Sequence, residues 1–496
     1  VLGIFRWWLL ILLSLVLVVW VLGQKYDGVR HSSIVADLRH TPRPVLILLL
    51  LLLAGCGWLF ARPAESFFVF NDAAVYTIGA VVLARTGSLF VNPDSFWYPT
   101  GAFLRQFFFT DHFGLLSRHY GPFYQWTPWN SALEIGFLPL PKVWMGLTVW
   151  LFGPEHATWA TPFLGLVSLA VFYCLVNQLL GWKIGLSATL LLGVSLPQIW
   201  FARYPISEIY TQCFFLGGLY LLVLAGKNIS NSTVSKRLAQ WSGLAFTTLT
   251  ILRLEAVLLL LVFAGLMLLG WYRKYAGWPI FARTWLMSLT VAGIVGLVLS
   301  VASARYYLFT RALELTPHFA QLSLFVALVA VACGMMWTRI KLMLIGYVKS
   351  ALFPAVVRHL PLVVALGWLL WGGIAGYHLI RQGEGQNLVD WVSWYWTVPA
   401  LILSTLGALW VLLQGYKKSV APELLVLLGS SVALLVGFSI RSYVYPIHPW
   451  AVRRLVPVVM PALVVTTASI LTMVDFRPAS ARARGAILRK WGLVGL

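Results

Sequence analysis

The sequence is poor in acidic residues and in charge of any kind. Only 15 of its 496 residues are Asp or Glu, against 36 Lys and Arg, and charged residues make up 10% of the chain. Hydrophobic residues make up 60%, and the mean hydropathy is +0.85. This balance excludes an ordinary soluble protein and indicates a polytopic membrane protein. The net charge of +21 is therefore attributed to membrane topology and lipid contact, and we expect no nucleic-acid partner.

Cysteine is also scarce, which excludes a disulfide-rich scaffold. The four cysteines all lie in apolar runs: Cys56, Cys174, Cys213 and Cys333. None has a partner at the spacing typical of metal ligands. We interpret them as small buried hydrophobic residues.

Long apolar runs dominate what is present. They recur at about the 20-residue length that crosses a bilayer as a helix, so we predict an all-α polytopic membrane protein with about 13 transmembrane helices. The predicted spans are 3–22, 44–61, 157–180, 184–202, 206–226, 240–252, 255–270, 284–304, 319–336, 360–378, 396–414, 421–439 and 455–474. The pair 240–252 and 255–270 forms either a helical hairpin or one bent helix. The first span lacks a small-residue cleavage site, so we expect it to be retained.

Lysine falls on one side of this topology. The loops assigned to the cytoplasm hold ten of the eleven lysines and 22 of the 36 Lys and Arg, while 11 of the 15 acids lie outside. A crossing at 139–152 would reverse every later loop, so we predict that this run is an interfacial helix on the outer leaflet. The first extracytoplasmic loop then spans 62–156, and its residues 72–86 are predicted to form a second amphipathic helix.

These boundaries divide the chain into three parts. Residues 1–43 form an extra N-terminal transmembrane helix with a cytoplasmic loop, and residues 44–474 form the main transmembrane domain. Residues 475–496 form a basic cytoplasmic tail, which we expect to contact anionic lipid. The protein is expected in a bacterial or archaeal plasma membrane, with its site facing outside.

Charged residues that are costly to keep beside lipid gather in five segments of the outer face. These are the loop with Asp72, 203–208 (RYPISE), 253–255 (RLE), 305–318 and 441–454 (RSYVYPIHPWAVRR). Arginine holds phosphate bidentately and stays charged where water is scarce. A carboxylate can act as a general base or bind a divalent cation. The pattern indicates an outward-facing site with one or two carboxylates and several arginines.

The order of several short motifs resembles a known family. They are an acid opening a helix (FNDAAVYTIGAVVLARTGSLF), a Pro-bounded interfacial helix (LPLPKVWMGLTVWLFG), RYPISEIY, GLAFTTLTILRLEA and RRLVPVVMP. Over residues 44–474 this order is similar to the membrane-embedded GT-C glycosyltransferases, particularly the branch of bacterial aminoarabinose transferase and protein O-mannosyltransferases. The chain departs from that branch in reading LPLPK, with the lysine after the prolines, and Asn71-Asp72 where many relatives have an Asp-Glu pair.

The resemblance implies roles for particular residues. The catalytic candidates are Asp72 and Glu208, of which Asp72 would deprotonate an acceptor hydroxyl or bind a metal beside it. A divalent cation held by Asp72 and Glu208 is the one cofactor that the resemblance allows. The candidates for holding the donor phosphate are Lys142, Arg203, Arg253, Arg453 and Arg454.

The expected function is transfer of a sugar from a polyprenyl-phosphate carrier to a lipid, glycan or protein acceptor, with either stereochemical outcome. Two alternatives stay open: a transporter or flippase of lipid-linked substrates, and a non-catalytic membrane scaffold. A transporter is expected to show related halves, or broken helices with charge near the bilayer midplane. Asp72 could also serve only to cap the helix 72–86, because acids are favoured at helix N-termini.

Overall fold

The structure is a computed structural model that describes most of the central part of the chain. The described residues are 41–64, 72–91, 109–112, 115–118, 123–125, 133–253, 278–304, 307–308, 352–380, 388–418, 421–440 and 452–472. The predicted spans 3–22, 255–270 and 319–336 and the tail 475–496 lie outside these residues, as does nearly all of the segment 1–43. The division of the chain into three parts stays a prediction.

The helices of the N-terminal half begin with α3 and end with α14. They are α3 (Arg43–Phe60), α4 (Asp72–Thr86), α7 (Leu140–Phe152), η1 (Pro154–Trp159), α8 (Ala160–Leu180), α9 (Trp182–Val194), α10 (Leu196–Arg203), α11 (Ser207–Lys227), α12 (Ser232–Thr248), η2 (Leu249–Ile251) and α14 (Trp278–Ser303). Glycines in the left-handed region end two of them. Gly153, with φ 100°, follows α7, and Gly181, with φ 95°, follows α8.

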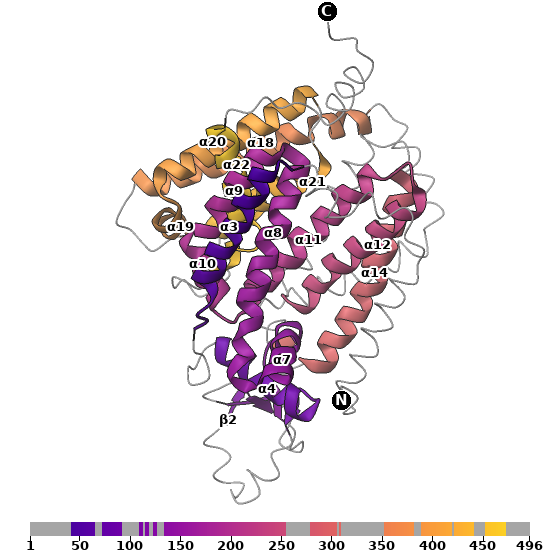
Figure 1. Cartoon of the computed structure of the whole chain (residues 1–496), viewed down its shortest axis with the longest axis vertical. Coiled ribbons are helices and arrows are strands. Elements are labelled where there is room, and N and C mark those ends of the chain that lie inside the picture. The colour runs from indigo at the N-terminus through magenta and orange to yellow at the C-terminus, as the bar shows by residue number, and fades with distance from the viewer. Residues whose placement is uncertain are drawn as a thin grey trace, which may run out of the picture.

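The helices of the C-terminal half follow after residue 351. They are α18 (Leu352–Ile380), α19 (Leu388–Trp396), α20 (Val398–Lys418), α21 (Pro422–Ile440), η3 (Val452–Leu455) and α22 (Val459–Leu471). In Figure 1, α18, α20 and α21 lie toward the end of the molecule opposite α4 and α7. The helical membrane fold that the sequence predicts is therefore confirmed in its general form.

By length and composition, seven of the described helices can cross a membrane, or eight if α9 and α10 form one broken span. The predicted number of 13 is not reached within the described residues. The predicted span 184–202 is bent by 61° between α9 and α10. The predicted span 455–474 becomes α22, with only 13 helical residues, because the chain first forms the 3₁₀ turn η3. The predicted span 240–252 coincides with the end of α12 and with η2.

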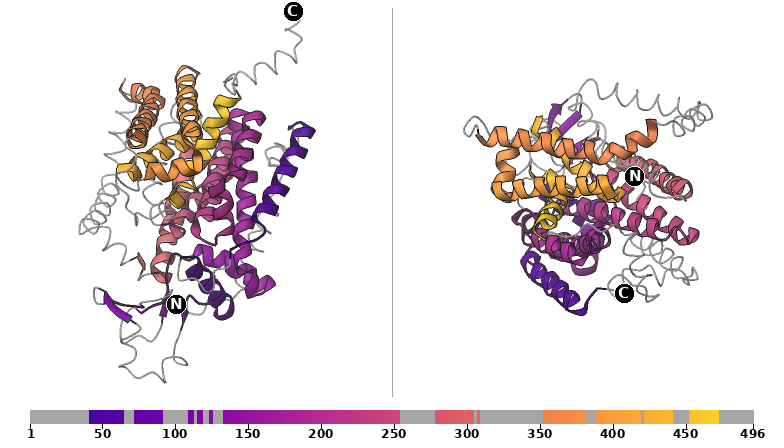
Figure 2. Two further views of the ribbon diagram at one scale, coloured as in Figure 1. Left: turned by 90° about the vertical axis from the view of Figure 1, so that its left-hand side faces the viewer. Right: turned by 90° about the horizontal axis from the view of Figure 1, so that it is seen from above.

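Burial separates a central helix from peripheral ones. Within the apolar 18-residue stretch of each helix, 83% of the residues are buried in α11, against 22% in α3 and 11% in α14. Both views of Figure 2 show α3, in indigo, at the edge of the bundle. Exposed Leu and Val side chains on α3 and α14 therefore fit lipid contact. The buried α11 is the element against which the site is assembled.

The first long loop has the two predicted helices and a small sheet. The observed α4 and α7 match the predicted runs 72–86 and 139–152 within one residue, while the placement of α7 at the outer leaflet stays a prediction. The five short strands are β1 (Phe90–Val91), β2 (Phe109–His112), β3 (Leu115–Arg118), β4 (Phe123–Gln125) and β5 (Leu133–Ile135). They form one antiparallel sheet in the order β1-β5-β4-β3-β2. These strands were not predicted, because the sequence of this stretch is that of a polar loop.

Candidate functional site: an ion-pair chain between four segments

The first component of the site is the start of α4. Asp72 is the first residue of that helix, and its Oδ2 accepts a hydrogen bond from Arg453 Nη1 at 2.6 Å. The Asp72 side chain is 24% exposed, and that of Arg453 is 13% exposed. The carboxylate is therefore engaged by a residue 381 positions away, a contact that helix capping alone does not explain.

The second component is the first turn of α11. Glu208 is 2% exposed, and its Oε1 accepts a hydrogen bond from Arg253 Nη1 at 2.8 Å. The same oxygen lies 3.4 Å from Arg453 Nε. Thr211 supports this turn by donating from its hydroxyl to the Ser207 carbonyl at 2.8 Å. A buried carboxylate of this kind needs such cationic partners, because an unpaired charge is costly in a site of low dielectric.

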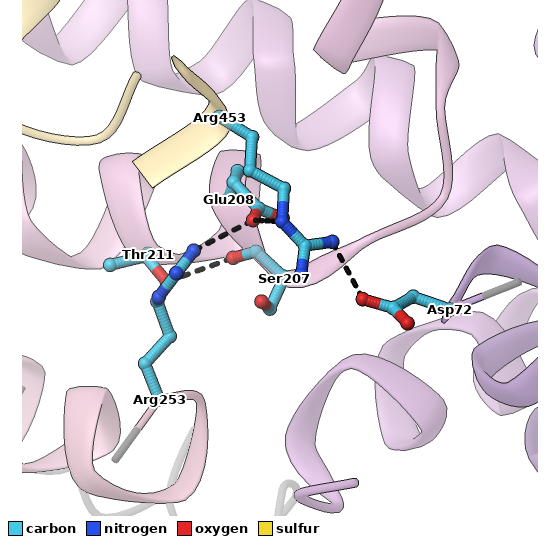
Figure 3. Close-up of polar contacts among 6 residues, drawn as sticks. All are labelled: Asp72, Ser207, Glu208, Thr211, Arg253 and Arg453. Atoms are coloured by element: carbon cyan, nitrogen blue, oxygen red, sulfur yellow. Dashed lines mark hydrogen bonds and ion pairs between the residues drawn. The ribbon is translucent and has the colours of Figure 1, made fainter. Parts of the chain in front are cut away.

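Arg453 connects the two carboxylates. Its guanidinium presents Nη1 to Asp72 and Nε to Glu208, which produces the chain Asp72–Arg453–Glu208–Arg253 (Figure 3). These four residues come from α4, η3, α11 and the end of the η2 turn. Four of the residues predicted for the site are thus brought together by the fold.

Arg454 adds a further positive charge beside this chain. It interacts electrostatically with Glu208 and Asp72, and burial and then repulsion from Arg253 lower its pKa to about 10. At neutral pH all three guanidiniums are charged. Three guanidiniums against two carboxylates leave a net charge of 3 − 2 = +1 among these five groups. Such an excess favours an anionic ligand.

Tyr76 was missed by the sequence analysis. It is buried and lies one helical turn after Asp72. Burial raises the pKa of its phenol, and so do the neighbouring Tyr307, Asp72 and Glu208. The phenol therefore stays protonated beside the carboxylates. The i, i+4 spacing of Asp72 and Tyr76 on a predicted helix was the available signal.

Lys142, a predicted phosphate-binding residue, lies outside the ion-pair chain. Its side chain is fully buried in α7, and Nζ donates to the carbonyl oxygens of Ile135 at 3.0 Å and Phe137 at 2.8 Å. Burial lowers the pKa of this amine to about 7, against the attraction of Glu134. A Cβ at Gly79 of α4 would lie 2.7 Å from Lys142 Cδ, so the glycine allows the two helices to approach. In this structure Lys142 stabilises the loop.

Arg203 also lies apart from the ion-pair chain. Its side chain is exposed, and Nε donates to the Arg62 carbonyl at 2.7 Å. The backbone N–H of Ala64 donates to the Arg203 carbonyl at 2.8 Å. Arg203 therefore joins the end of α10 to the end of α3, and a role in holding the donor stays a prediction.

A divalent cation shared by Asp72 and Glu208 fits this arrangement poorly. The Arg453 guanidinium already contacts both carboxylates, and a second cation there would be repelled. Within the part of the chain that the structure describes, no group of three or more His, Cys, Asp or Glu residues could hold a metal. Metal dependence stays a prediction, and no step below is routed through a metal.

No protein-family model matches the sequence, and no curated protein sequence matches it. Solved membrane-protein structures resemble this chain over about 90% of its length, at 11–13% sequence identity and TM-scores below 0.5. The oligosaccharyltransferase of Archaeoglobus fulgidus, in complex with Zn and sulfate, aligns with a TM-score of 0.49 and 12% identity. The alignment covers 90% of this chain and 51% of the oligosaccharyltransferase chain. ArnT from Cupriavidus metallidurans bound to undecaprenyl phosphate has a TM-score of 0.45 and 13% identity, and covers 92% and 64%. The chain thus spans about half the length of the oligosaccharyltransferase and under two thirds of ArnT.

Proposed function

We propose that this protein is a membrane glycosyltransferase that moves a sugar from a polyprenyl-phosphate carrier to an acceptor at the extracytoplasmic face. The observation that carries the proposal is the ion-pair chain Asp72–Arg453–Glu208–Arg253, in which one guanidinium contacts two carboxylates of different exposure. The ion-pair chain and Arg454 lie at the starts of α4 and α11, just after η2 and in the turn η3 before α22.

The charge of the cluster suits a lipid phosphate. The net excess of one positive charge complements a phosphodiester, and guanidinium groups bind phosphate oxygens through paired N–H donors. The apolar helices around the cluster suit an isoprenoid chain, which remains in the bilayer while its phosphate reaches the arginines. A soluble nucleotide-sugar would not need a site surrounded by such helices.

The two carboxylates are suited to different tasks. Glu208 is buried and held by two arginines, so its negative charge orients Arg253 and Arg453. Asp72 is the more exposed of the two, so an acceptor hydroxyl can reach it more readily. We assign Asp72 as the general base and Glu208 as the residue that holds the phosphate-binding arginines in place.

The reaction then follows from these positions. The acceptor oxygen forms a bond to the anomeric carbon while the bond from that carbon to the phosphate oxygen breaks. The leaving electron pair goes to the phosphate oxygen, where guanidinium groups stabilise the added negative charge. The hydroxyl proton goes to Asp72. As a single displacement this scheme inverts the anomeric configuration, whereas retention would need a second displacement through a covalent intermediate.

For Asp72 to act as a base, its pairing with Arg453 must weaken. A bound phosphate supplies that change, because it competes with Asp72 for the Nη1 donor of Arg453. Donor binding would thereby release the Asp72 carboxylate for the acceptor hydroxyl. Base activity is then coupled to donor occupancy, which protects the free site from unproductive proton transfer.

A transport function has less support. The broken pair α9 and α10 has Ser195 at its bend, between Val194 and Leu196, with no charged residue at the break. In a transporter the broken helices are expected to carry ion-binding or substrate-binding groups at that point. The charges of the ion-pair chain instead lie at the first turns of α4 and α11, in η3 and just after η2.

The test is sugar transfer by the purified protein in lipid nanodiscs with a panel of polyprenyl-phosphate sugars. We expect release of polyprenyl phosphate, and a loss of about a hundredfold or more in Asp72→Asn. Asp390→Asn is the matched control, because Asp390 also lies in the first turn of a helix, α19, but is no part of the ion-pair chain. Equal activity of wild type and Asp72→Asn would refute the assignment of the base. Absence of both transfer and polyprenyl-phosphate binding would refute the enzyme class.

A further inference from the structure

Two buried glutamines form a reciprocal amide pair next to the site. Gln212 lies on α11, one turn after Glu208, and Gln198 lies on α10. Gln198 Nε2 donates to Gln212 Oε1, and Gln212 Nε2 donates to Gln198 Oε1, both at 3.0 Å. Their exposed fractions are 1% and 0%. Fully buried polar side chains are rare among the helices of a membrane protein, and they usually have a structural or functional role.

Gln212 has every hydrogen-bonding group satisfied. Its Oε1 also accepts from the Ser168 hydroxyl at 2.8 Å, and its Nε2 also donates to the Val456 carbonyl at 2.9 Å. The amide therefore joins four separate segments, α8, α10, α11 and the residues before α22. Among buried amides, a network with no missing partner specifies one geometry, because any displacement leaves a polar group unpaired.

The bond to Val456 connects this network to the site. Val456 follows Arg453 by three residues, and its N–H donates to the Arg453 carbonyl at 3.2 Å, which closes the turn. The turn is thus held to α11 at two points, Val456 to Gln212 and Arg453 to Glu208. Glu208 and Gln212 are one helical turn apart, so the two contacts together fix the position of the turn along α11. Figure 3 shows Arg453 reaching from this turn to Glu208 and Asp72.

The bend of 61° between α9 and α10 belongs to the same arrangement. α10 starts again after Ser195 with a proline in its first turn, and Gln198 follows on that turn. The break thus places Gln198 on an element that runs in a different direction from α9. It brings the amide of Gln198 within hydrogen-bonding distance of α11.

We propose that Gln212, supported by Gln198, is a positioning residue that sets the location of Arg453 for the phosphate of the lipid-linked donor. The inference rests on the proposed function and adds to it how the phosphate-binding arginine is held. Gln212 acts through its hydrogen bond to the Val456 carbonyl. Its loss would allow the turn to shift along α11 and weaken the phosphate contact.

The test measures binding of undecaprenyl phosphate to the full chain in nanodiscs, together with thermal stability. We expect Gln212→Leu to weaken binding about tenfold and Gln198→Leu to weaken it less, since the Val456 bond remains. Tyr210→Phe is the matched control: Tyr210 is on the same helix and shares a buried hydrogen bond of 3.1 Å with Thr161, away from Val456. It should lose the stability of one hydrogen bond, less than Gln212→Leu loses, with binding unchanged within about twofold.

A second comparison, in the Arg453→Met variant, distinguishes a purely structural role of Gln212 from a role in positioning Arg453. If Gln212 acts through Arg453, Gln212→Leu weakens phosphate binding in wild type but has little further effect in Arg453→Met. Additive effects in the two backgrounds, or unchanged binding in Gln212→Leu, would overturn the inference while Arg453 kept its role. Failure of the wild type to bind the lipid phosphate would overturn the proposed function and this inference together.

Discussion

Replacement of Glu208 by Gln removes the shared negative charge of the ion-pair chain while keeping the size of the side chain. Oε1 of Glu208 contacts Arg253 Nη1 at 2.8 Å and Arg453 Nε at 3.4 Å. The substitution leaves an amide oxygen that can still accept a bond, but both guanidiniums lose their buried counter-charge. Arg453 retains Asp72 as a partner.

The magnitude follows from the burial of the three groups. Glu208 is 2% exposed, and Arg253 and Arg453 are 11% and 13% exposed, so solvent screens the lost charge weakly. Removing one partner of a buried pair costs roughly 3–5 kcal/mol. Because the amide keeps an acceptor and Asp72 remains, we expect the lower end, about 3 kcal/mol. That is a factor of about 100 in the folding equilibrium.

The assay is unfolding in mixed micelles with a rising fraction of denaturing detergent. Glu155→Gln is the matched control, because Glu155 is 66% exposed and its ion pair is a 3.5 Å contact with His156. An exposed pair contributes about 0–1 kcal/mol. In the double variant with Arg253→Met, the cost should be less than the sum of the single costs. A Glu208→Gln variant as stable as Glu155→Gln would refute the ion-pair chain as described.

Three further outcomes test the packing and the loop. Gly407→Ala should destabilise the protein by about 1–3 kcal/mol in the same assay, because a Cβ there meets the carbonyl of Thr466 on α22, whereas Gly437→Ala has open space and should be neutral or stabilising. Thr397→Gly should raise the melting temperature by relieving a φ of 53° that costs a β-branched residue about 1 kcal/mol, and a lower melting temperature would contradict this. The pKa of Lys142 is about 7 in the folded protein, against an ordinary value of 10.5. Between these two values the folded protein binds fewer protons than the unfolded chain, so its stability should rise with pH. Melting temperatures at pH 7 and pH 9 should show this rise in wild type and a smaller rise in Lys142→Met.

The helices themselves were largely predictable, because their signals are local. A run of about 20 apolar residues is costly outside a membrane or core, whichever neighbours it has. The two helices of the first loop were predicted from the residues at their ends. The helix α4 begins at Asp72, and α7 follows a proline and ends before Gly153. The breaks were less predictable, since the bend of 61° after Val194 is favoured by the partner that Gln198 finds on another helix.

The sequence by itself determined that this is a helical membrane protein, and it selected the residue types of the candidate site. Only the tertiary structure decided which of those residues lie together. Asp72 and Arg453 are 381 positions apart, and their contact exists because η3 is held against α11 beside the start of α4. Lys142 and Arg203 are basic residues as well, yet their side chains donate to backbone carbonyls elsewhere. Charge and spacing select the candidates, whereas the distance between side chains of different helices depends on how those helices pack.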